Sequence, residues 1–344
     1  MSLNSREIDV INIIVQVYIQ HAGPVGSRYV AKHSQMGLSP ASMRNIMADL
    51  TDKGYLTQPY TSAGRIPTQK AFRFYVDSML KPGPLSREQQ KSIREYLTQA
   101  GLQFSDILEQ TSKLISSQAS QVGMAVAPQK DLVRWQQIDF VLLRPGLVLA
   151  VLVFQGGIIQ NKLLNVEEKL TADDLVKFGN YLNESFQGRT IIEVKKKILE
   201  QMQEARNRFN ELYSKALHLA QDTFSQDSKP EIFLEGTLHV LDRLDSKDLS
   251  SMRELLEFLE QRSELLGLLE KISKSREGLS IVFGTEFYGP ELGEWGLISS
   301  PYQVRGQTLG MVGTIGPIHM DYSRLVPMVD YIAKMLSEIL ETRF

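Results

Sequence analysis

The chain of 344 residues contains no cysteine and no long uncharged apolar segment. The missing cysteine excludes disulfide bonds and thiolate chemistry, which agrees with a reducing compartment. No apolar run approaches the ~18–20 residues that a membrane-spanning helix needs. The first twenty residues carry Arg6, Glu7 and Asp9 and lack a signal-peptide cleavage pattern. We therefore expect a cytoplasmic protein that has no membrane partner.

The motifs of common catalytic sites are also missing. The five histidines are scattered at positions 21, 33, 218, 239 and 319, without metal-ligand spacing or an H-E-x-x-H pattern. The glycines at 310, 313 and 316 do not have the G-x-G-x-x-G spacing of a dinucleotide loop, and neither a Walker nor a G-x-S-x-G sequence occurs. We therefore expect a protein that is not an enzyme and that needs no metal or cofactor.

The two signs of charge nearly balance over the whole chain, but they are unevenly distributed along it. There are 38 Lys and Arg against 40 Asp and Glu, a net charge of −2. Within residues 1–80, eight basic side chains stand against five acidic ones, so the rest of the chain is net acidic. A basic first segment followed by an acidic body is typical of a protein whose first domain faces DNA.

Residues 39–54 predict one short helix with clear start and stop signals. Ser39 is a favoured N-cap, and Pro40 fits the first turn because its missing N–H costs no hydrogen bond there. Gly54 lies where a left-handed C-terminal cap is expected. The apolar positions at helical spacing are Met43, Ile46, Met47 and Leu50. The opposite face is small, polar and nearly free of acid over two turns, as a helix in the DNA major groove requires.

The flanking segments complete a winged helix-turn-helix pattern. Residues 5–21 predict an amphipathic helix, and Ser27 is expected to cap a second helix that runs to about residue 34. A tight turn then leads into the helix after Ser39. Residues 55–66 predict a hairpin with a turn-rich tip, the wing, and a fourth helix opens at residues 67–68. The alternative is a small helical domain that only packs against its neighbours.

Ten side chains of this segment are candidate DNA contacts, because arginine and asparagine can read guanine and adenine in the major groove and basic or hydroxyl groups can bind phosphate. They are Ser39, Ala41, Ser42, Arg44 and Asn45 around the third helix, Arg28 and Lys32 on the second helix, and Thr61, Ser62 and Arg65 in the wing. Asp49 and Asp52 indicate that base reading is concentrated in the first half of the third helix. Because one short helix reads only a few base pairs, we expect a dimer on two half-sites.

The remainder of the chain predicts an α+β body with an insertion. After a Lys-Pro-Gly-Pro linker at residues 81–84, a helical stretch is followed by strands, then by about a hundred mostly helical residues, then by strands and a last helix. The predicted strands are at residues 122–127, 138–143, 147–154, 158–166, 279–284, 297–304 and 309–315. We therefore divide the chain into a winged-helix domain at 1–81, an α+β domain with an antiparallel sheet at 86–170 and 276–344, and a mostly helical insertion at 171–275. A leucine-rich stripe at residues 252–272 is interpreted either as a subunit interface or as intramolecular core.

Four runs of the sequence are more specific than the element patterns above. They are Pro24-Val-Gly-Ser27, Leu38-Ser-Pro-Ala-Ser-Met-Arg-Asn45, the wing run Thr61-Ser-Ala-Gly-Arg-Ile-Pro-Thr68, and Gly310-Met-Val-Gly-Thr-Ile-Gly-Pro317 near the end. Together they resemble the HrcA family of bacterial heat-inducible transcription repressors. The resemblance covers nearly the whole chain, and the wing run is far more specific than a generic helix-turn-helix. Two positions depart from the family pattern: Ile46 replaces a usual Asp, and Tyr60 replaces a usual His.

The resemblance implies a homodimeric repressor of chaperone operons that binds an inverted-repeat operator through its winged-helix head. It also implies a GAF-like domain that carries an inserted dimerisation domain, in agreement with the interruption of the strand pattern. Activity of the family is sustained by the chaperonin, so that unfolded proteins relieve repression during heat shock.

Two competing interpretations remain open. GAF-type domains also sense ligands, so the chain could be a metabolite-responsive regulator, with Tyr302 and Arg305 as candidate polar groups of a pocket. The leucine-rich helices could instead belong to a scaffold that binds partner proteins without DNA, although the basic first segment and the wing run argue against it.

Overall fold

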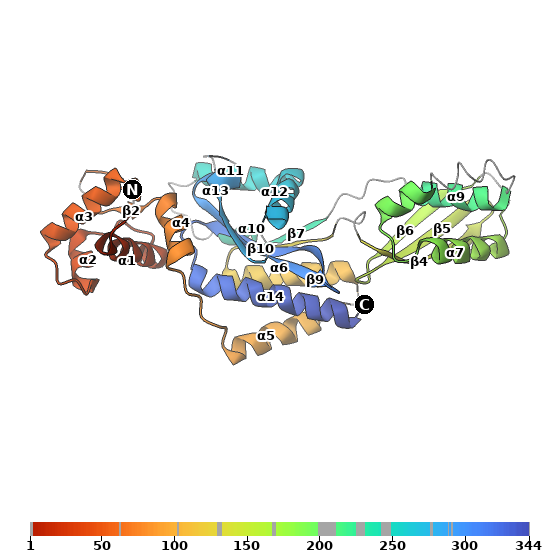
Figure 1. Cartoon of the computed structure of the whole chain (residues 1–344), viewed down its shortest axis with the longest axis horizontal. Helices are drawn as coiled ribbons and strands as arrows, with labels where there is room; N and C mark the ends of the chain where they lie inside the picture. Colours follow the sequence, from red (N-terminus) through yellow and green to blue (C-terminus); the bar gives the residue numbers. More distant parts are fainter. Residues whose placement is uncertain are drawn as a thin grey trace.

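The computed structural model describes residues 3–61, 63–101, 103–128, 133–166, 170–198, 211–224, 231–241, 249–275, 278–287, 289 and 292–343. It is a mixed α+β protein with antiparallel sheets, and its parts follow one another along the long axis of the molecule (Figure 1). A head is built from residues 3–79, a central body contains a five-stranded sheet, and a distal unit contains a three-stranded sheet.

The head consists of four helices and a short hairpin. Its elements are α1 (Ser5–His21), α2 (Ser27–His33), α3 (Pro40–Asp52), β1 (Leu56–Thr57), β2 (Ile66–Pro67) and α4 (Gln69–Ser78). Asn4 caps α1 by accepting a hydrogen bond from the backbone N–H of Glu7. The apolar sides of α1, α3 and α4 meet in one core, to which Ile11, Met43 and Phe72 contribute fully buried side chains.

The body is organised around one antiparallel sheet in the order β7-β3-β10-β9-β8. Its strands are β3 (Val122–Val126), β7 (Ile232–Glu235), β8 (Ser280–Phe283), β9 (Trp295–Val304) and β10 (Gln307–Pro317). The helices are α5 (Arg87–Thr98), α6 (Phe104–Ala119), α10 (Thr237–Leu241), α11 (Leu249–Glu260), α12 (Arg262–Ser275), α13 (Gly284–Phe287) and α14 (Tyr322–Arg343). Since β9 sends Ile298 toward the core shared with α14 and Leu297 toward the core shared with α11 and α12, helices cover both faces of the sheet.

The distal unit is a meander of three strands with helices on one face. It contains β4 (Trp135–Arg144), β5 (Leu147–Phe154), β6 (Ile159–Asn165), α7 (Ala172–Phe186), a helical segment at residues 191–198, and α9 (Glu211–Phe224). Alternation along β5 buries Val148, Ala150, Leu152 and Phe154 on the helix side. The other side of this sheet carries no helix from the parts of the chain described above.

The membership of the two sheets differs from the predicted grouping of strands. The prediction assigns residues 138–166 to the same sheet as residues 297–315, but β4, β5 and β6 pair only with one another among the described strands. Conversely, β7 lies in the predicted helical insertion, yet it pairs with β3 in the body sheet. Strand pairing depends on residues that are distant in the sequence, so the apolar pattern of one strand does not identify the strand beside it.

The leucine-rich stripe is intramolecular core, and its interpretation as a subunit interface is wrong. The prediction places the stripe in one helical block, but the stripe is divided between two helices, α11 and α12. Leu255, Leu259 and Leu269 are buried against the body sheet together with Leu297 and Met311. Five of the stripe's seven side chains are buried within the chain, while Leu256 and Leu266 are half-buried, so the covering of a hydrophobic sheet face accounts for most of the periodicity.

Two smaller expectations also change. Ser27 is the first residue of α2, whose N-cap is Gly26 and has no side-chain cap. The predicted helical stretch at residues 86–120 is divided into α5 and α6. Across the described residues, no helix has both the length and the apolar character required to cross a membrane.

Candidate nucleic-acid interface

Helix α3 presents a polar face to solvent because its other face is fixed in the head core. Ser39 Oγ accepts a hydrogen bond from the N–H of Ser42 at 3.1 Å, and Pro40 follows in the first turn. At the other end Gly54 adopts φ +76°, the left-handed conformation predicted for it. Met43, Met47 and Leu50 are buried and Ile46 is half-buried, so the predicted stripe is confirmed.

The predicted readers on α3 therefore point outward. Ala41, Arg44 and Asn45 are exposed, and Ser42 is half-buried beside the cap. Figure 1 shows α2 and α3 at the end of the head that faces away from the body, where a duplex could approach them.

The wing is joined to the start of α2 by backbone hydrogen bonds. Val25 and Arg65 form an isolated bridge in which each N–H donates to the other's carbonyl, at 2.8 and 2.9 Å. Gly64 makes this approach feasible, because a Cβ at that position would lie 2.4 Å from the Val25 carbonyl oxygen. Gln58 shapes the tip by donating from Nε2 to the carbonyls of Thr61 and Ala63 at 2.8 and 3.0 Å. The predicted contact Ser62 lies outside the described residues.

A groove runs between the start of α2, the middle of α3 and the wing. The residues that line it are Gly26, Ser27, Arg28, Arg44, Met47, Gln58, Thr61, Ala63, Gly64 and Arg65. The structure thus brings together four of the predicted contacts, with arginines from three different elements. No lining residue is acidic, so the groove has a positive potential suited to phosphate. Lys32, Ser39, Ala41, Ser42 and Asn45 lie outside the lining.

Arg65 is positioned by a residue that the sequence pattern does not single out. Its Nε donates to Thr51 Oγ1 at 3.1 Å, and Thr51 Oγ1 donates to the carbonyl of Met47 at 2.8 Å. The wing arginine is therefore coupled directly to α3. The sequence alone does not distinguish Thr51 from other helical threonines. The hydrogen bond to Arg65 becomes evident only when the hairpin is folded against α3.

Comparison with known proteins shows which family this architecture belongs to. The family model described as the HrcA protein C terminal domain matches residues 105–326. The heat-inducible transcription repressor HrcA of Nitratidesulfovibrio vulgaris (strain Miyazaki F) is 42% identical over 100% of this chain and 97% of its own length. The repressor of the same name from Geobacter sulfurreducens is 36% identical over 98% of both chains.

The chain belongs to the HrcA family of heat-inducible transcription repressors. HrcA proteins are transcription repressors and not enzymes, and repression implies binding to operator DNA. A solved structure described only as a hypothetical protein has a TM-score of 0.60 at 23% identity and covers 99% of both chains, so the fold is shared along the whole length.

The two departures from the usual HrcA pattern lie in different surroundings. Ile46 is half-buried and packs against the head core, as expected for an apolar side chain on that side of α3. Tyr60 is 62% exposed at the tip of the wing, where its ring is free to meet a DNA backbone.

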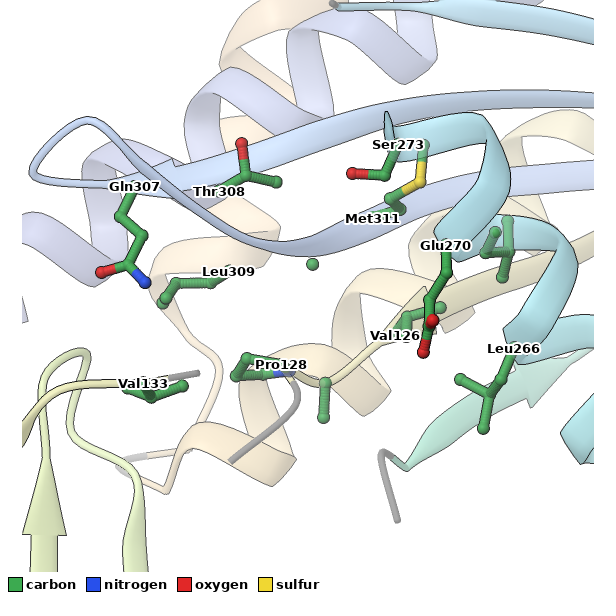
Figure 2. A pocket seen from close by; sticks show the side chains of 13 residues that line it. Val126, Pro128, Val133, Leu266, Glu270, Ser273, Gln307, Thr308, Leu309 and Met311 are labelled. Carbon is green, nitrogen blue, oxygen red and sulfur yellow. The ribbon is translucent and has the colours of Figure 1, made fainter. Parts of the chain in front are cut away.

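A second concavity in this HrcA-family chain lies in the body, between α12 and the ends of β3 and β10. It encloses about 150 Å³ and has mainly apolar walls, which include Val126, Leu269 and Met311. Figure 2 shows the side chains of Glu270 and Ser273 on α12 and of Gln307 on β10 around it.

The two polar candidates proposed for a ligand pocket do not line this concavity. Tyr302 is fully buried and donates from its hydroxyl to the carbonyl of Val126 at 2.8 Å, and burial raises the pKa of the phenol. Arg305 is in the turn between β9 and β10 with φ +52°. Tyr302 therefore stabilises the sheet, and Arg305 belongs to a turn.

Proposed function

We propose that this HrcA-family chain represses heat-shock chaperone operons in the cytoplasm by binding an inverted-repeat operator as a homodimer through a winged-helix head. The observation that carries the proposal is the groove in which Arg28, Arg44 and Arg65 converge from α2, α3 and the wing. Three guanidinium groups without a carboxylate among them suit a phosphodiester backbone beside a helix in the major groove.

The polar side chains of the head divide into proposed base contacts and proposed phosphate contacts. Arg44 and Asn45 are exposed on α3 and suit the hydrogen-bonding edges of guanine and adenine, while Ala41 permits close approach. Arg28 and Arg65 flank α3 in the groove and suit phosphate. Ser39, Ser42, Lys32, Thr61 and Ser62 complete the proposed contact set.

The open face of the distal sheet supports the dimer. Val141, Leu149 and Leu163 form a cross-strand row on the side opposite the helices, and Val141 and Leu163 are 47% and 61% exposed. Leu143, 51% exposed, extends this row along β4, and Ile159, 64% exposed, lies on the same face beyond Asn161. Exposed apolar side chains gathered on one sheet face mark an interaction site. A second copy of the chain is the occupant that also supplies the second head required by an inverted repeat.

The sheet topology supports a revised division into domains. We take the body, with its central antiparallel sheet and helices on both faces, as the GAF-like domain. The inserted dimerisation domain then corresponds to the distal unit between residues 133 and 224, an α+β unit that includes β4, β5 and β6. The segment with α10, α11 and α12 returns to the body, because it packs on the body sheet.

The loss of repression on heat shock, and the maintenance of activity by the chaperonin, rest on the family resemblance. A chaperonin dependence is tested by adding purified chaperonin and ATP to the repressor before measuring operator binding. Increased operator occupancy supports the proposal, and equal occupancy with and without chaperonin contradicts it.

Fluorescence anisotropy against duplex DNA tests the central proposal. The duplexes carry the inverted repeat expected for HrcA repressors or a version with one half-site scrambled, across a salt series. The intact repeat is expected to bind at least about 100-fold more tightly, with a log–log salt slope that indicates several phosphate contacts. The Arg44→Ala variant should lose this preference. Arg87→Ala, an exposed arginine on α5, is the matched control and should bind like wild type. Equal binding of both duplexes by wild type contradicts the proposal.

The dimer surface has a separate test. Leu163→Glu places a charge on the open face and should convert the dimer to monomer in sedimentation velocity. Val176→Glu is the matched control, since Val176 is 59% exposed on α7 on the helix side. Dimers that survive Leu163→Glu, or that dissociate equally with Val176→Glu, contradict this assignment.

The alternative function, a metabolite-responsive regulator, is favoured by one observation, the apolar concavity beside α12. Its volume suits a molecule of about the size of benzene, with Glu270, Ser273 and Gln307 available as polar partners. Native mass spectrometry of the purified protein tests it. A retained small molecule that is lost in Ser273→Trp supports this function, and an unliganded mass argues for a protein without an effector.

A further inference from the structure

Arg73 connects the head to the body through four hydrogen bonds of its guanidinium group, and a fifth contact stays within α4. Nε donates to Glu286 Oε1 at 2.8 Å, and Nη2 donates to Glu286 Oε2. Nη1 and Nη2 also donate to the carbonyl of Ile281 at 3.2 and 3.1 Å, and Nη1 contacts Asp77 Oδ1 at 3.4 Å. An arginine has five such donors in a fixed plane, so few orientations of the group satisfy all of them.

The body side of this contact is held by its own hydrogen bonds. Ile281 belongs to β8, the edge strand of the body sheet, and its carbonyl faces Arg73. Glu286 Oε2 accepts a hydrogen bond from the N–H of Phe283 at 3.0 Å, which holds the carboxylate toward Arg73. The ring of Phe283 is buried, and its centroid lies 4.4 Å from Arg73 Cζ.

Two further contacts join the head to the body. Thr285 Oγ1 donates to Gln69 Oε1 one turn before Arg73 on α4. Tyr18 of α1 meets His319 edge-on with ring centroids 5.7 Å apart. Figure 1 shows α4 beside the body, while α3 lies at the far end of the head. The docked head therefore leaves its DNA-facing surface open.

The covalent connection alone does not fix this orientation. After Met79 the chain has neither helix nor strand through residue 86, and it includes Lys81-Pro-Gly-Pro84. An extended segment of this length spans roughly 20 Å. A head held only by the linker could turn over a wide range relative to the body.

We propose that Arg73 is a positioning residue for operator binding: it locks each head against the edge of the body sheet and thereby sets the distance and phase between the two half-sites that the dimer accepts. This inference rests on the proposed function, because it presupposes two heads on one inverted repeat. Locked heads fit one spacing of the half-sites, whereas tethered heads tolerate many.

The test compares three duplexes: the operator with its natural spacing, the same half-sites with about 5 bp added, which is half a helical turn, and a single half-site. For wild type, the added spacer should weaken binding by about 100-fold, toward the affinity of the single half-site. For Arg73→Ala and for Glu286→Ala, the penalty should fall below about 10-fold, and binding to the single half-site should be unchanged. Arg253→Ala, an arginine 81% exposed on α11, is the control and should keep the wild-type profile.

A double variant tests whether Arg73 and Glu286 act through their contact with each other. The Arg73→Ala/Glu286→Ala chain should show the same spacing profile as Arg73→Ala, because Arg73→Ala already removes the contact between the two residues. A wild-type spacing penalty in Arg73→Ala, tighter operator binding than wild type, or loss of single half-site binding in both variants would each overturn the positioning role. A wild-type chain that binds the single half-site as well as the inverted repeat shows instead that the proposed function itself fails.

Discussion

Glu7 and Lys53 join the beginning of α1 to the end of α3, with Lys53 Nζ at 2.7 and 2.8 Å from the two carboxylate oxygens. Glu7 is only 4% exposed, and it also accepts a hydrogen bond from the N–H of Asn4 at 3.0 Å. The pair therefore fixes the helix that carries Arg44 to the first helix of the head.

Removal of Lys53 should destabilise the head. Lys53→Met leaves the buried carboxylate of Glu7 without its cation, at a cost of about 1–3 kcal/mol in the local free energy of unfolding. Hydrogen exchange of the α1 and α3 amides in the full-length protein measures this loss. Lys91→Met is the control, since Lys91 and Glu95 are both exposed and 3.7 Å apart, and it should change exchange by less than about 0.5 kcal/mol. Equal exchange in Lys53→Met and wild type would contradict the role of the pair.

The same pair should make the stability of the head depend on acidity. The hydrogen bond from Lys53 lowers the pKa of the Glu7 carboxyl below its ordinary value. Its contribution is therefore complete above the pKa of the unfolded carboxyl and is lost as the pH falls through the lower folded pKa. The difference in α1 exchange between wild type and Lys53→Met should accordingly be full at neutral pH and shrink in strong acid. A difference that stays constant over this range would exclude Glu7 as its source.

The head could be predicted from sequence because its signals are local. Ser39, Pro40 and Gly54 mark the ends of α3 within sixteen positions, and each side of the helix follows from its apolar spacing. The same helical spacing predicts that Arg44 and Asn45, the proposed base contacts, are exposed. The coupling of Arg65 to Thr51 was not predictable, because it depends on how the wing folds back over α3.

The body was only partly predictable because its pairings are distant. The hairpin of β4 and β5 follows from the Pro-Gly turn between them, but β3 pairs with β10 through Met124 and Gly313, which are far apart in the sequence. Periodicity likewise shows that Leu255 and Leu269 each lie on the apolar face of a helix without showing what covers that face. The covering partner is the sheet of the same chain.

The two classes of arginine in the groove should respond differently to DNA sequence and to salt. Arg44→Ala removes a proposed base contact and should cost about 1–3 kcal/mol on the operator, with little effect on a scrambled duplex. Arg28→Ala removes a proposed phosphate contact, so it should weaken both duplexes alike and reduce the log–log salt slope by about 1. Because both side chains are exposed, neither variant should change the melting temperature. Anisotropy titrations at several salt concentrations separate the two patterns, and a uniform effect of Arg44→Ala would reassign it to phosphate.

The close approach of the wing to α2 leads to a prediction at Gly64. A methyl group there would lie 2.4 Å from the Val25 carbonyl oxygen and 2.5 Å from its carbon, and these backbone atoms cannot turn away as a side chain could. Gly64→Ala should therefore push the wing outward, break the Val25–Arg65 bridge and cost about 1–3 kcal/mol in head stability. Because Arg65 moves with the wing, operator affinity should fall by about tenfold.

Gly83→Ala provides the matched control for this change, since a Cβ at Gly83 meets no atom within 4 Å. Hydrogen exchange at Val25 and Arg65 follows the bridge directly, and anisotropy follows the operator. Faster exchange at these two amides together with weaker operator binding, in Gly64→Ala but not in Gly83→Ala, would show that the groove depends on the wing's position. If exchange at the bridge rises while operator binding stays at the wild-type level, the wing arginine does not contribute to DNA binding, and the contact set reduces to α2 and α3.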